Sequence, residues 1–242
     1  MKAILLAAGV GRRLSAALDG KPKCLLALGG RTLLGRLITS LGKAGVQEAV
    51  VVVGYQRELI ESTIGAHYRG VHMRYIFNPD YEKGAILSLW AARDELDDDV
   101  LVMDADVLCP DEMISRLVDS PHANCFLMDG RVSGSGEEQM LMAREGRVYD
   151  IARTAKPGYD QVGESVGFLK VSRGSAPELV ESLREQVEAG RDRVEHEDAY
   201  PSFMQKCAVG YERVDDLPWT EIDFAEDIER AEHEMLPLID QS

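Results

Sequence analysis

The first half of the chain alternates short apolar runs with longer amphipathic segments. Four short, largely apolar runs that end at turns predict buried strands, and they cover residues 2–6, 49–53, 73–77 and 100–103. Apolar side chains recur at helical spacing between these runs, over residues 32–42, 58–64 and 85–96. This alternation predicts parallel strands that are covered by helices on both faces.

The second half of the chain changes to strands separated by turns that contain glycine. Strands are expected over residues 125–128, 139–144, 147–151, 162–171 and 208–214, and helices over 177–188, 197–206 and 224–235. We expect antiparallel pairing among the first four of these strands. The predicted fold class is therefore α/β, with a Rossmann-like mixed, mainly parallel sheet and a small antiparallel element in the second half. Without an internal repeat or linker, residues 1–242 are expected to form one domain.

The first predicted strand opens directly into a loop of small residues. Backbone amides can approach a ligand closely where side chains are small, and cations nearby favour a phosphate group. The loop consists of Leu6, Ala7, Ala8, Gly9, Val10 and Gly11, and it is followed by Arg12, Arg13, Lys21 and Lys23. This combination predicts a binding site for a nucleoside triphosphate.

Other interpretations of the loop fit its spacing less well. A dinucleotide-binding fingerprint needs a small residue where this chain has Leu14, and a Walker loop needs a Gly-Lys-Ser/Thr sequence that is absent. A plain turn between strand and helix remains the alternative, because glycine marks turns of every kind. The cluster of cations argues against that alternative.

Charge and composition exclude several classes of function. The formal net charge of -15 repels polyanions, so we expect no nucleic-acid partner. No run reaches the ~18 apolar residues of a membrane helix, and the N-terminus does not resemble a secretory signal, so we expect a cytoplasmic protein without membrane contact. The four cysteines lack C-x-x-C spacing, which predicts reduced thiols without zinc or disulfides. The five histidines show no metal-binding spacing, and most lie in polar stretches typical of a surface.

Two acidic motifs supply candidate metal ligands. Asp104 and Asp106 follow a predicted strand at its carboxyl end, and their spacing points both carboxylates the same way if the strand persists. Glu221 and Asp223 follow Trp219. Because Mg²⁺ prefers oxygen ligands and uses one or two carboxylates, Asp106 and Asp223 could hold this ion together.

Each acidic motif also has a purely structural alternative. The first motif could form a turn or cap a helix, although Asp111 is the better cap for the helix that starts there. In the second motif, Asp223 could cap a helix that begins at Phe224, with Glu226 as its partner.

The N-terminal motif resembles the signature of the nucleotidyltransferases that activate phosphorylated small molecules. The resemblance rests on the small-residue loop, Arg13-Leu14 and Pro22-Lys23, whereas Arg12 departs from the Ser or Thr usual in this family. It implies a metal-binding aspartate after the central strand and another before the last helix, which match Asp106 and Asp223. Mg²⁺ is accordingly the expected cofactor.

Within this family, the chain resembles the phosphocholine cytidylyltransferase branch more than the hexose-phosphate branch. The resemblance rests on Asn78-Pro79, Ser88-Leu89 and the run from Trp219 to Asp223. It implies transfer of CMP from CTP to a small aminoalkyl phosphate or phosphonate, of the phosphocholine or 2-aminoethylphosphonate type, with release of pyrophosphate. The alternatives are a sugar-1-phosphate nucleotidyltransferase using UTP or dTTP, and a non-catalytic nucleotide-binding sensor. The oligomeric state stays open, with a homodimer as one option.

The resemblance and the residue chemistry give each site residue an expected role. Lys23 and Arg13 are the expected catalytic residues, because they would neutralise charge on the reacting phosphates. The expected nucleotide-binding residues are Leu6, Ala7, Ala8, Gly9, Gly11, Arg13, Lys23, Asn78, Gly84, Ser88 and Asp104. An ammonium group on the acceptor is attracted to aromatic faces and carboxylates, although each aromatic residue could instead belong to the core. The expected acceptor-binding residues are Tyr81, Tyr159, Glu164, Glu197, Trp219 and Glu221.

Overall fold

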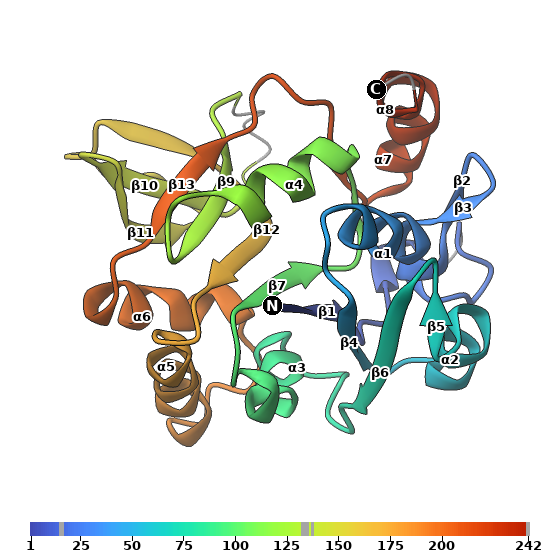
Figure 1. The fold of residues 1–242 in the computed structure, drawn as a ribbon, viewed down its shortest axis with the longest axis horizontal. Coiled ribbons are helices and arrows are strands. Elements are labelled where there is room, and N and C mark those ends of the chain that lie inside the picture. Colours follow the sequence, from blue (N-terminus) through green and yellow to red (C-terminus); the bar gives the residue numbers. More distant parts are fainter. Residues whose placement is uncertain (15–16, 132–135, 137, 241–242) are drawn as a thin grey trace.

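Four parallel strands form the centre of the sheet in a computed structural model, which describes residues 1–14, 17–131, 136 and 138–240. They lie in the order β7 (Val100–Asp104), β1 (Lys2–Ala7), β4 (Glu48–Val53) and β6 (Val71–Phe77) (Figure 1). All three contacts between them are parallel, as their apolar runs predict. The carboxyl ends of these strands therefore meet at one edge of the sheet.

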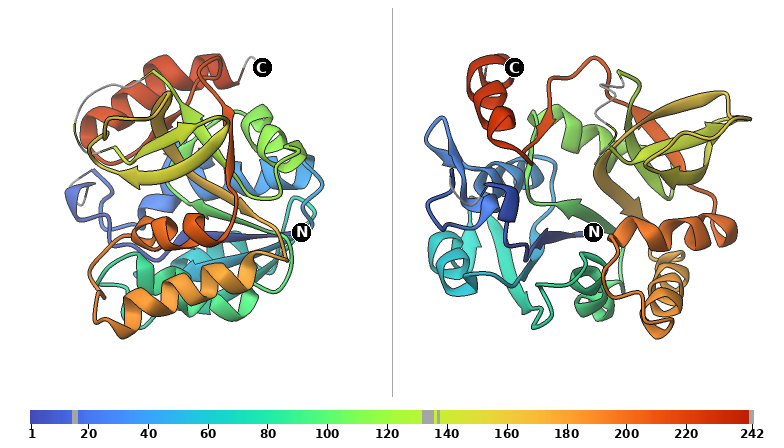
Figure 2. Two further views of the ribbon diagram at one scale, coloured as in Figure 1. Left: turned by 90° about the vertical axis from the view of Figure 1, so that its left-hand side faces the viewer. Right: turned by 180° about the vertical axis from the view of Figure 1, so that it is seen from behind.

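Helices cover both faces of this sheet (Figure 2). Leu5 and Val51 face one layer of helices and Ile4 and Val52 face the other, because successive side chains of a strand point to opposite faces. The first layer consists of α1 (Leu33–Lys43), α2 (Arg57–Ile64) and α4 (Asp111–Asp119). The second layer consists of α3 (Ile86–Ala91), α5 (Ala176–Glu188) and α6 (Tyr200–Lys206). The expected Rossmann-like α/β architecture is confirmed.

The strands of the second half extend the sheet beyond β7. They are β9 (Cys125–Asp129), β10 (Met140–Arg144), β11 (Arg147–Ala152), β12 (Gln161–Val171) and β13 (Gly210–Arg213). The β10–β11, β10–β12 and β12–β9 pairs are antiparallel, as expected. By contrast, β13 pairs with β9 in parallel, because the chain reaches β13 through the helical layer rather than through a hairpin.

Three of the expected helices differ in extent. The helix expected over residues 85–96 ends at Ala91 and is followed by the 3-10 turn Arg93–Glu95. The helix expected over 197–206 begins as the 3-10 turn His196–Ala199. The closing helix expected over 224–235 consists of α7 (Ala225–Arg230), the π-helical turn Ala231–Met235 and α8 (Leu236–Ile239). Helix ends depend on local hydrogen bonding that apolar periodicity does not report.

Several two-residue strands and short turns were not predicted, because they are too short to show a period. They are β2 (Ala27–Leu28), β3 (Arg31–Thr32), β5 (His67–Tyr68), β8 (Val107–Leu108) and β14 (Thr220–Glu221), with 3-10 turns at Arg12–Leu14 and Lys23–Leu25. Two of these strands, β8 and β14, prove important for the site.

All four cysteines are free, as their spacing predicts. Among the described residues, no helix has both the length and the apolar character needed to cross a membrane.

A separate apolar cluster attaches the C-terminal helices to the beginning of the chain. Leu14 and Leu28 pack there with Ile222 and Ile239. Beside this cluster, the Arg36 guanidinium donates to the backbone oxygen of Leu28 at 2.8 Å and to the carboxylate of Asp240 at 2.9 Å. In Figure 1, α7 and α8 accordingly lie next to α1 and the β2–β3 hairpin. The C-terminal segment is thereby held close to the N-terminal loop.

We expect Arg36→Met to lower the free energy of unfolding by about 1–3 kcal/mol, because it leaves the Leu28 carbonyl without its donor. Urea denaturation measures this change. Arg31→Ala is the matched control, since Arg31 also reaches Asp240 but its side chain is 44% exposed. Equal losses for the two variants would contradict the assigned importance of the buried bond.

Candidate active site

A cleft of about 780 Å³ lies where the expected site residues converge. Its walls come from the loop after β1, the turn before α3, the end of β7, the middle of β12, the segment before α6 and the segment around β14. The expected residues that line it are Leu6, Ala8, Gly9, Gly11, Arg13, Lys23, Tyr81, Gly84, Ser88, Asp104, Asp106, Glu164, Glu197, Trp219, Glu221 and Asp223.

Three expected site residues do not line the cleft. Ala7 is buried in the core, and Asn78 is buried behind the wall, where its side-chain amide donates to the Ser88 hydroxyl at 3.1 Å. Tyr159 lies in the connection between β11 and β12. The structure therefore gives Asn78 a supporting contact with a wall residue and keeps Tyr159 apart from the other expected acceptor residues.

The N-terminal loop turns sharply at the mouth of the cleft. Gly11 adopts a φ of 62°, which favours glycine, and its oxygen accepts the first bond of the following 3-10 turn from the Leu14 amide. Leu14 packs into the apolar cluster and fixes the end of this turn. The Arg13 guanidinium lies over the Phe224 ring, 5.0 Å from its centroid. Arg13 is thus held at the junction of the loop and the C-terminal segment.

A two-strand ladder brings the two acidic motifs together. β14 pairs with β8 in antiparallel register, which sets Glu221 opposite Val107, and the Ile222 amide donates to the backbone oxygen of Asp106 at 3.2 Å. As a result, carboxylate oxygens of Asp106, Glu221 and Asp223 lie within 4.8 Å of one another. Neither strand was predicted, so the sequence alone did not explain why these motifs should meet.

Lys23 lies between two of these carboxylates. Its Nζ is 2.6 Å from Asp106 Oδ2 and 2.7 Å from Asp223 Oδ1. Burial alone would lower the pKa of this lysine, but the adjacent charges of Asp106 and Asp223 raise it above its usual value. Lys23 therefore stays protonated and contacts Asp223, which lies 200 residues further along the chain.

The same acidic group has the properties of a site for a divalent cation. Asp106 Oδ1 is buried and lacks a hydrogen-bond partner among the described residues. Burial raises the pKa of Asp106 although Lys23 opposes this, and desolvation together with Asp106 and Asp223 raises the pKa of Glu221. One lysine leaves three carboxylates undercompensated, and carboxylate oxygens are the ligands that Mg²⁺ prefers. The residues therefore fit such an ion.

The purely structural alternatives for the two motifs do not hold. The N-cap of α7 is Phe224, and Asp223 Oδ1 accepts from Lys23 rather than from an amide of the first helical turn. The Asp227 carboxylate accepts from the backbone amides of Asp223 and Phe224 at 2.9 and 2.8 Å. Asp111 begins α4, and its carboxylate accepts from the Ser40 hydroxyl at 2.6 Å. The carboxylates of Asp106 and Asp223 are consequently available to the cleft.

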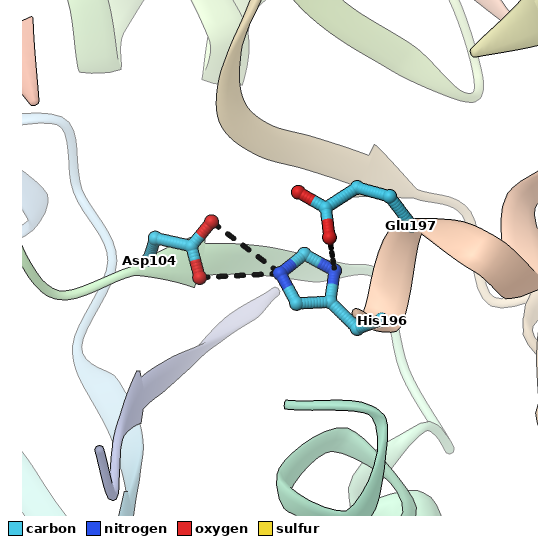
Figure 3. Close-up of side chains that lie close together, drawn as sticks. All are labelled: Asp104, His196 and Glu197. Carbon is cyan, nitrogen blue, oxygen red and sulfur yellow. Dashed lines mark hydrogen bonds and ion pairs between the residues drawn. The ribbon is translucent and has the colours of Figure 1, made fainter. Parts of the chain in front are cut away.

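Asp104 faces a different partner from Asp106. β7 ends at Asp104 and does not continue to Asp106. The two carboxylates were expected to point the same way only if it did, so this expectation is wrong. Instead, His196 Nε2 lies 3.1 and 3.3 Å from the two Asp104 oxygens, and Nδ1 lies 3.4 Å from Glu197 (Figure 3). Nδ1 also lies 2.8 Å from the Tyr200 hydroxyl. Burial alone would lower the pKa of His196, but Glu197 and Asp104 raise it to about 10.

His196 is a functional candidate that sequence reasoning missed. It is 2% exposed, although it lies in a polar stretch that predicted a surface position. Its spacing of four residues from Tyr200 is the only sequence signal, and that spacing is common on helices.

Another part of the cleft wall carries a second arrangement of charged and aromatic groups. Trp219 Nε1 donates to Asp129 Oδ2 at 2.7 Å, and Arg131 also pairs with this buried carboxylate. The nearby Glu164 carboxylate has no hydrogen-bond partner among the described side chains. Burial and the charges of Glu138 and Asp129 raise the pKa of Glu164 to about 7, although the more weakly acting charges of Arg230 and Arg131 oppose the rise. Asp129 and Arg131 were not predicted, because their strand end showed no motif.

Comparison with known proteins identifies the chain's relatives. A model of the MobA-like NTP transferase domain family matches residues 3–162, more than half of the chain. Over 125 residues, the chain is 36% identical to the CMP-5'-(3-aminopropyl)phosphonate synthase of Streptomyces rubellomurinus, an alignment covering 51% of this chain and 20% of that protein. Over 103 residues, it is 35% identical to a UTP–glucose-1-phosphate uridylyltransferase of Haloferax volcanii, covering 43% of this chain and 42% of that protein. The chain thus spans less than half of the length of these two relatives.

Two further comparisons extend over nearly the whole chain. The CTP:phosphoglutamine cytidylyltransferase of Campylobacter jejuni is 25% identical over 95% of this chain and 98% of its own length. The structure of the CTP:phosphocholine cytidylyltransferase of Streptococcus pneumoniae superimposes with a TM-score of 0.73, covering 96% of this chain and 97% of that one. Its sequence identity is 23%, so this likeness establishes the fold.

We expect Mg²⁺ to stabilise a Lys23→Met variant more than it stabilises the unchanged protein. Removing the lysine leaves Asp106 and Asp223 without their cation, which should increase the affinity for a divalent ion. A tenfold gain in affinity is ~1.4 kcal/mol, or an additional rise of about 3–6 °C in melting temperature for a chain of this size.

Thermal unfolding with and without millimolar Mg²⁺ measures this difference. Lys21→Met, which removes an exposed lysine nearby, is the control, and Lys23→Met combined with Asp106→Asn should lose the additional rise. An equal Mg²⁺ response in the two single variants would show that the acidic group does not hold the ion.

Proposed function

The chain belongs to the MobA-like NTP transferase domain family, and on that premise we propose that it transfers CMP from CTP to a small aminoalkyl phosphate or phosphonate. The single observation that carries the proposal is the meeting of three features in one cleft. These are the N-terminal phosphate-binding loop, Lys23 with its acidic partners, and an unpaired carboxylate beside a fixed tryptophan. The first two suit a nucleoside triphosphate, and the third suits an acceptor that carries an ammonium group.

The reaction requires positioning and charge stabilisation rather than a nucleophilic side chain. An oxygen of the acceptor phosphate or phosphonate attacks the α-phosphorus of CTP, the bond from that phosphorus to the bridging oxygen breaks, and pyrophosphate leaves with the electron pair. Arg13 and the amides of the loop would hold the departing phosphates, and Lys23 would neutralise charge on the reacting phosphate. Asp106 and Asp223, with Glu221 beside them, would hold Mg²⁺, which supplies further neutralisation of the phosphates when bound.

The nucleotide is assigned to the wall formed by the loop after β1 and the turn before α3. Leu6, Ala8 and Gly9 would contact it from the loop, and Gly84 and Ser88 from the turn. Asp104 lies beside the start of the loop, because β7 pairs with β1 at Leu6. Asn78 would act indirectly, through its bond to Ser88.

The acceptor is assigned to the wall that carries Trp219 and Glu164. The bond between Trp219 and Asp129 fixes the indole, which gives an ammonium group a rigid aromatic surface. Glu164 would supply the opposing charge, because no described side chain pairs with it and an ammonium ion would relieve its unfavourable surroundings. Tyr81 and Glu197 also line the cleft and remain candidates for further contacts.

A sugar 1-phosphate acceptor with UTP or dTTP is the second candidate. Glu138 and Gln139 line the cleft near Glu164, and such groups can also bond to sugar hydroxyls. A non-catalytic sensor is less well supported, because binding alone would not require Lys23 and the acidic group to be retained together.

A panel of nucleotides and acceptors tests the proposal. CTP, UTP, ATP, GTP and dTTP are combined with phosphocholine, 2-aminoethylphosphonate and glucose 1-phosphate in the presence of Mg²⁺, and pyrophosphate release is measured. We expect turnover with CTP and an amino-containing acceptor, and its loss in Asp106→Asn. Turnover only with glucose 1-phosphate and UTP or dTTP would favour the second candidate, and binding of nucleotide without turnover would favour the sensor.

We expect Glu164→Gln to raise KM for the amino-containing acceptor by about 10- to 100-fold, which corresponds to the loss of one hydrogen bond to a charged group. KM for CTP should remain unchanged. Because Glu164 binds the ammonium only when ionised, KM for the acceptor should rise as the pH falls below about 7 in the unchanged enzyme and remain flatter in the variant.

Steady-state kinetics between pH 5.5 and 8.5 measure both effects. The acceptor's own ionisation affects KM equally in the unchanged enzyme and in the variant, so it cancels in the ratio of their two KM values. Glu138→Gln is the matched variant, since removing its negative charge should lower the pKa of Glu164 and move the rise in KM to lower pH. An unchanged acceptor KM in Glu164→Gln would remove this residue from the acceptor site.

A further inference from the structure

Each carboxylate of the Asp104-x-Asp106 motif has its own cation. Lys23 contacts Asp106 at 2.6 Å, and His196 contacts Asp104 at 3.1 Å. Both cations are largely withdrawn from solvent, with side chains that are 16% and 3% exposed. The charge of Asp104 contributes to the raised pKa of Asp106, so the two carboxylates are close enough to interact.

The segment that carries His196 is attached to the wall assigned to the nucleotide. The Gly84 amide donates to the backbone oxygen of Asp192 at 2.8 Å, and the Ile86 amide donates to the backbone oxygen of Val194 at 3.2 Å. A side chain at Gly84 would overlap the backbone of Val194, so this close contact requires glycine. His196 is therefore fixed relative to the turn before α3.

The Asp104 carboxylate is confined from two other sides. β7 pairs with β1 so that Asp104 lies opposite Leu6. On β12, Gly167 has a φ of 80°, and a side chain there would overlap the Asp104 carboxylate. The backbone thus leaves Asp104 little room, and His196 determines the remaining direction of its side chain.

His196 has an acceptor at each ring nitrogen, which is the arrangement that an imidazolium requires. Asp104 lies at Nε2, and Glu197 and Tyr200 lie at Nδ1. Its pKa of about 10 agrees with this geometry. A protonated ring has no free lone pair for a metal, so the group of Asp104, His196 and Glu197 is an ion-pair cluster rather than a second metal site.

We propose that His196 is a positioning residue that holds the Asp104 carboxylate on the nucleotide side of the cleft, away from the group formed by Asp106, Glu221 and Asp223. Asp104 then contacts the nucleotide, and of the two aspartates only Asp106 binds the metal ion. This inference rests on the proposed function in that Asp104 is taken to contact the nucleotide.

A double-mutant cycle tests this role, because His196 is proposed to act through Asp104. His196→Gln should raise KM for the nucleotide by about 10- to 30-fold, or ~1.4–2 kcal/mol. The concentration of free Mg²⁺ that gives half-maximal rate should change by less than about twofold, since the metal group keeps Lys23. Combined with Asp104→Asn, His196→Gln should cause almost no further loss. His233→Gln, which alters an exposed histidine, is the matched control.

The outcomes separate this inference from the proposed function. Absence of turnover by the unchanged enzyme with every nucleotide and acceptor would overturn the function, and with it the role of His196. Turnover with any nucleotide allows the cycle to be measured with that nucleotide. Additive losses in the double variant, or a lower melting temperature with unchanged KM, would overturn the positioning role alone.

A second variant covers the case in which His196→Gln fails to fold. Tyr200→Phe removes the hydroxyl at Nδ1 and keeps the packed ring. It should raise nucleotide KM in the same direction by a smaller factor, about 3-fold, which is the loss of part of one hydrogen bond. An unchanged KM in a folded Tyr200→Phe variant, together with a His196→Gln variant that does not fold, would count against the proposal.

Discussion

The contact of Lys23 with Asp106 and Asp223 is the interaction on which the candidate site depends. It joins the N-terminal loop, the end of the central sheet and the segment before the last helices. Separating one partner would leave charge in a poorly solvated place, which is costly even where the pair itself adds little stability. Because each partner comes from a different part of the chain, losing this contact would disturb the arrangement of the cleft.

Two other features make this contact possible. The register of the β8–β14 ladder places Glu221 and Asp223 next to Asp106. The apolar cluster around Leu14 and Ile222 holds the C-terminal segment against the loop. Arg36 adds a buried bond to Leu28 at the edge of this cluster. Apolar packing thus supplies the attachment, and the charged groups determine the geometry within it.

Charge is divided between the walls of the cleft. On one side, His196 and Lys23 each compensate one carboxylate of the same short motif. On the other side, Asp129 is satisfied by Trp219 and Arg131, while Glu164 remains unpaired among the described side chains. Glu164 and the acidic group of Asp106, Glu221 and Asp223 are left undercompensated. These are the places where a cationic part of a substrate or a metal ion would gain most.

Periodicity determined the central sheet, because strands such as β4 consist almost entirely of apolar residues, which reveals them without tertiary information. The loop from Leu6 to Gly11 and the two acidic motifs could also be found in the sequence, since each is a local run of characteristic residues. The sequence could not determine how these runs meet. Two-residue strands such as β8 and β14 have no period, and the burial of His196 follows from the docking of its segment on Gly84. Contacts between distant segments depend on shape and packing in three dimensions, so only the tertiary structure decided which carboxylate faces which cation.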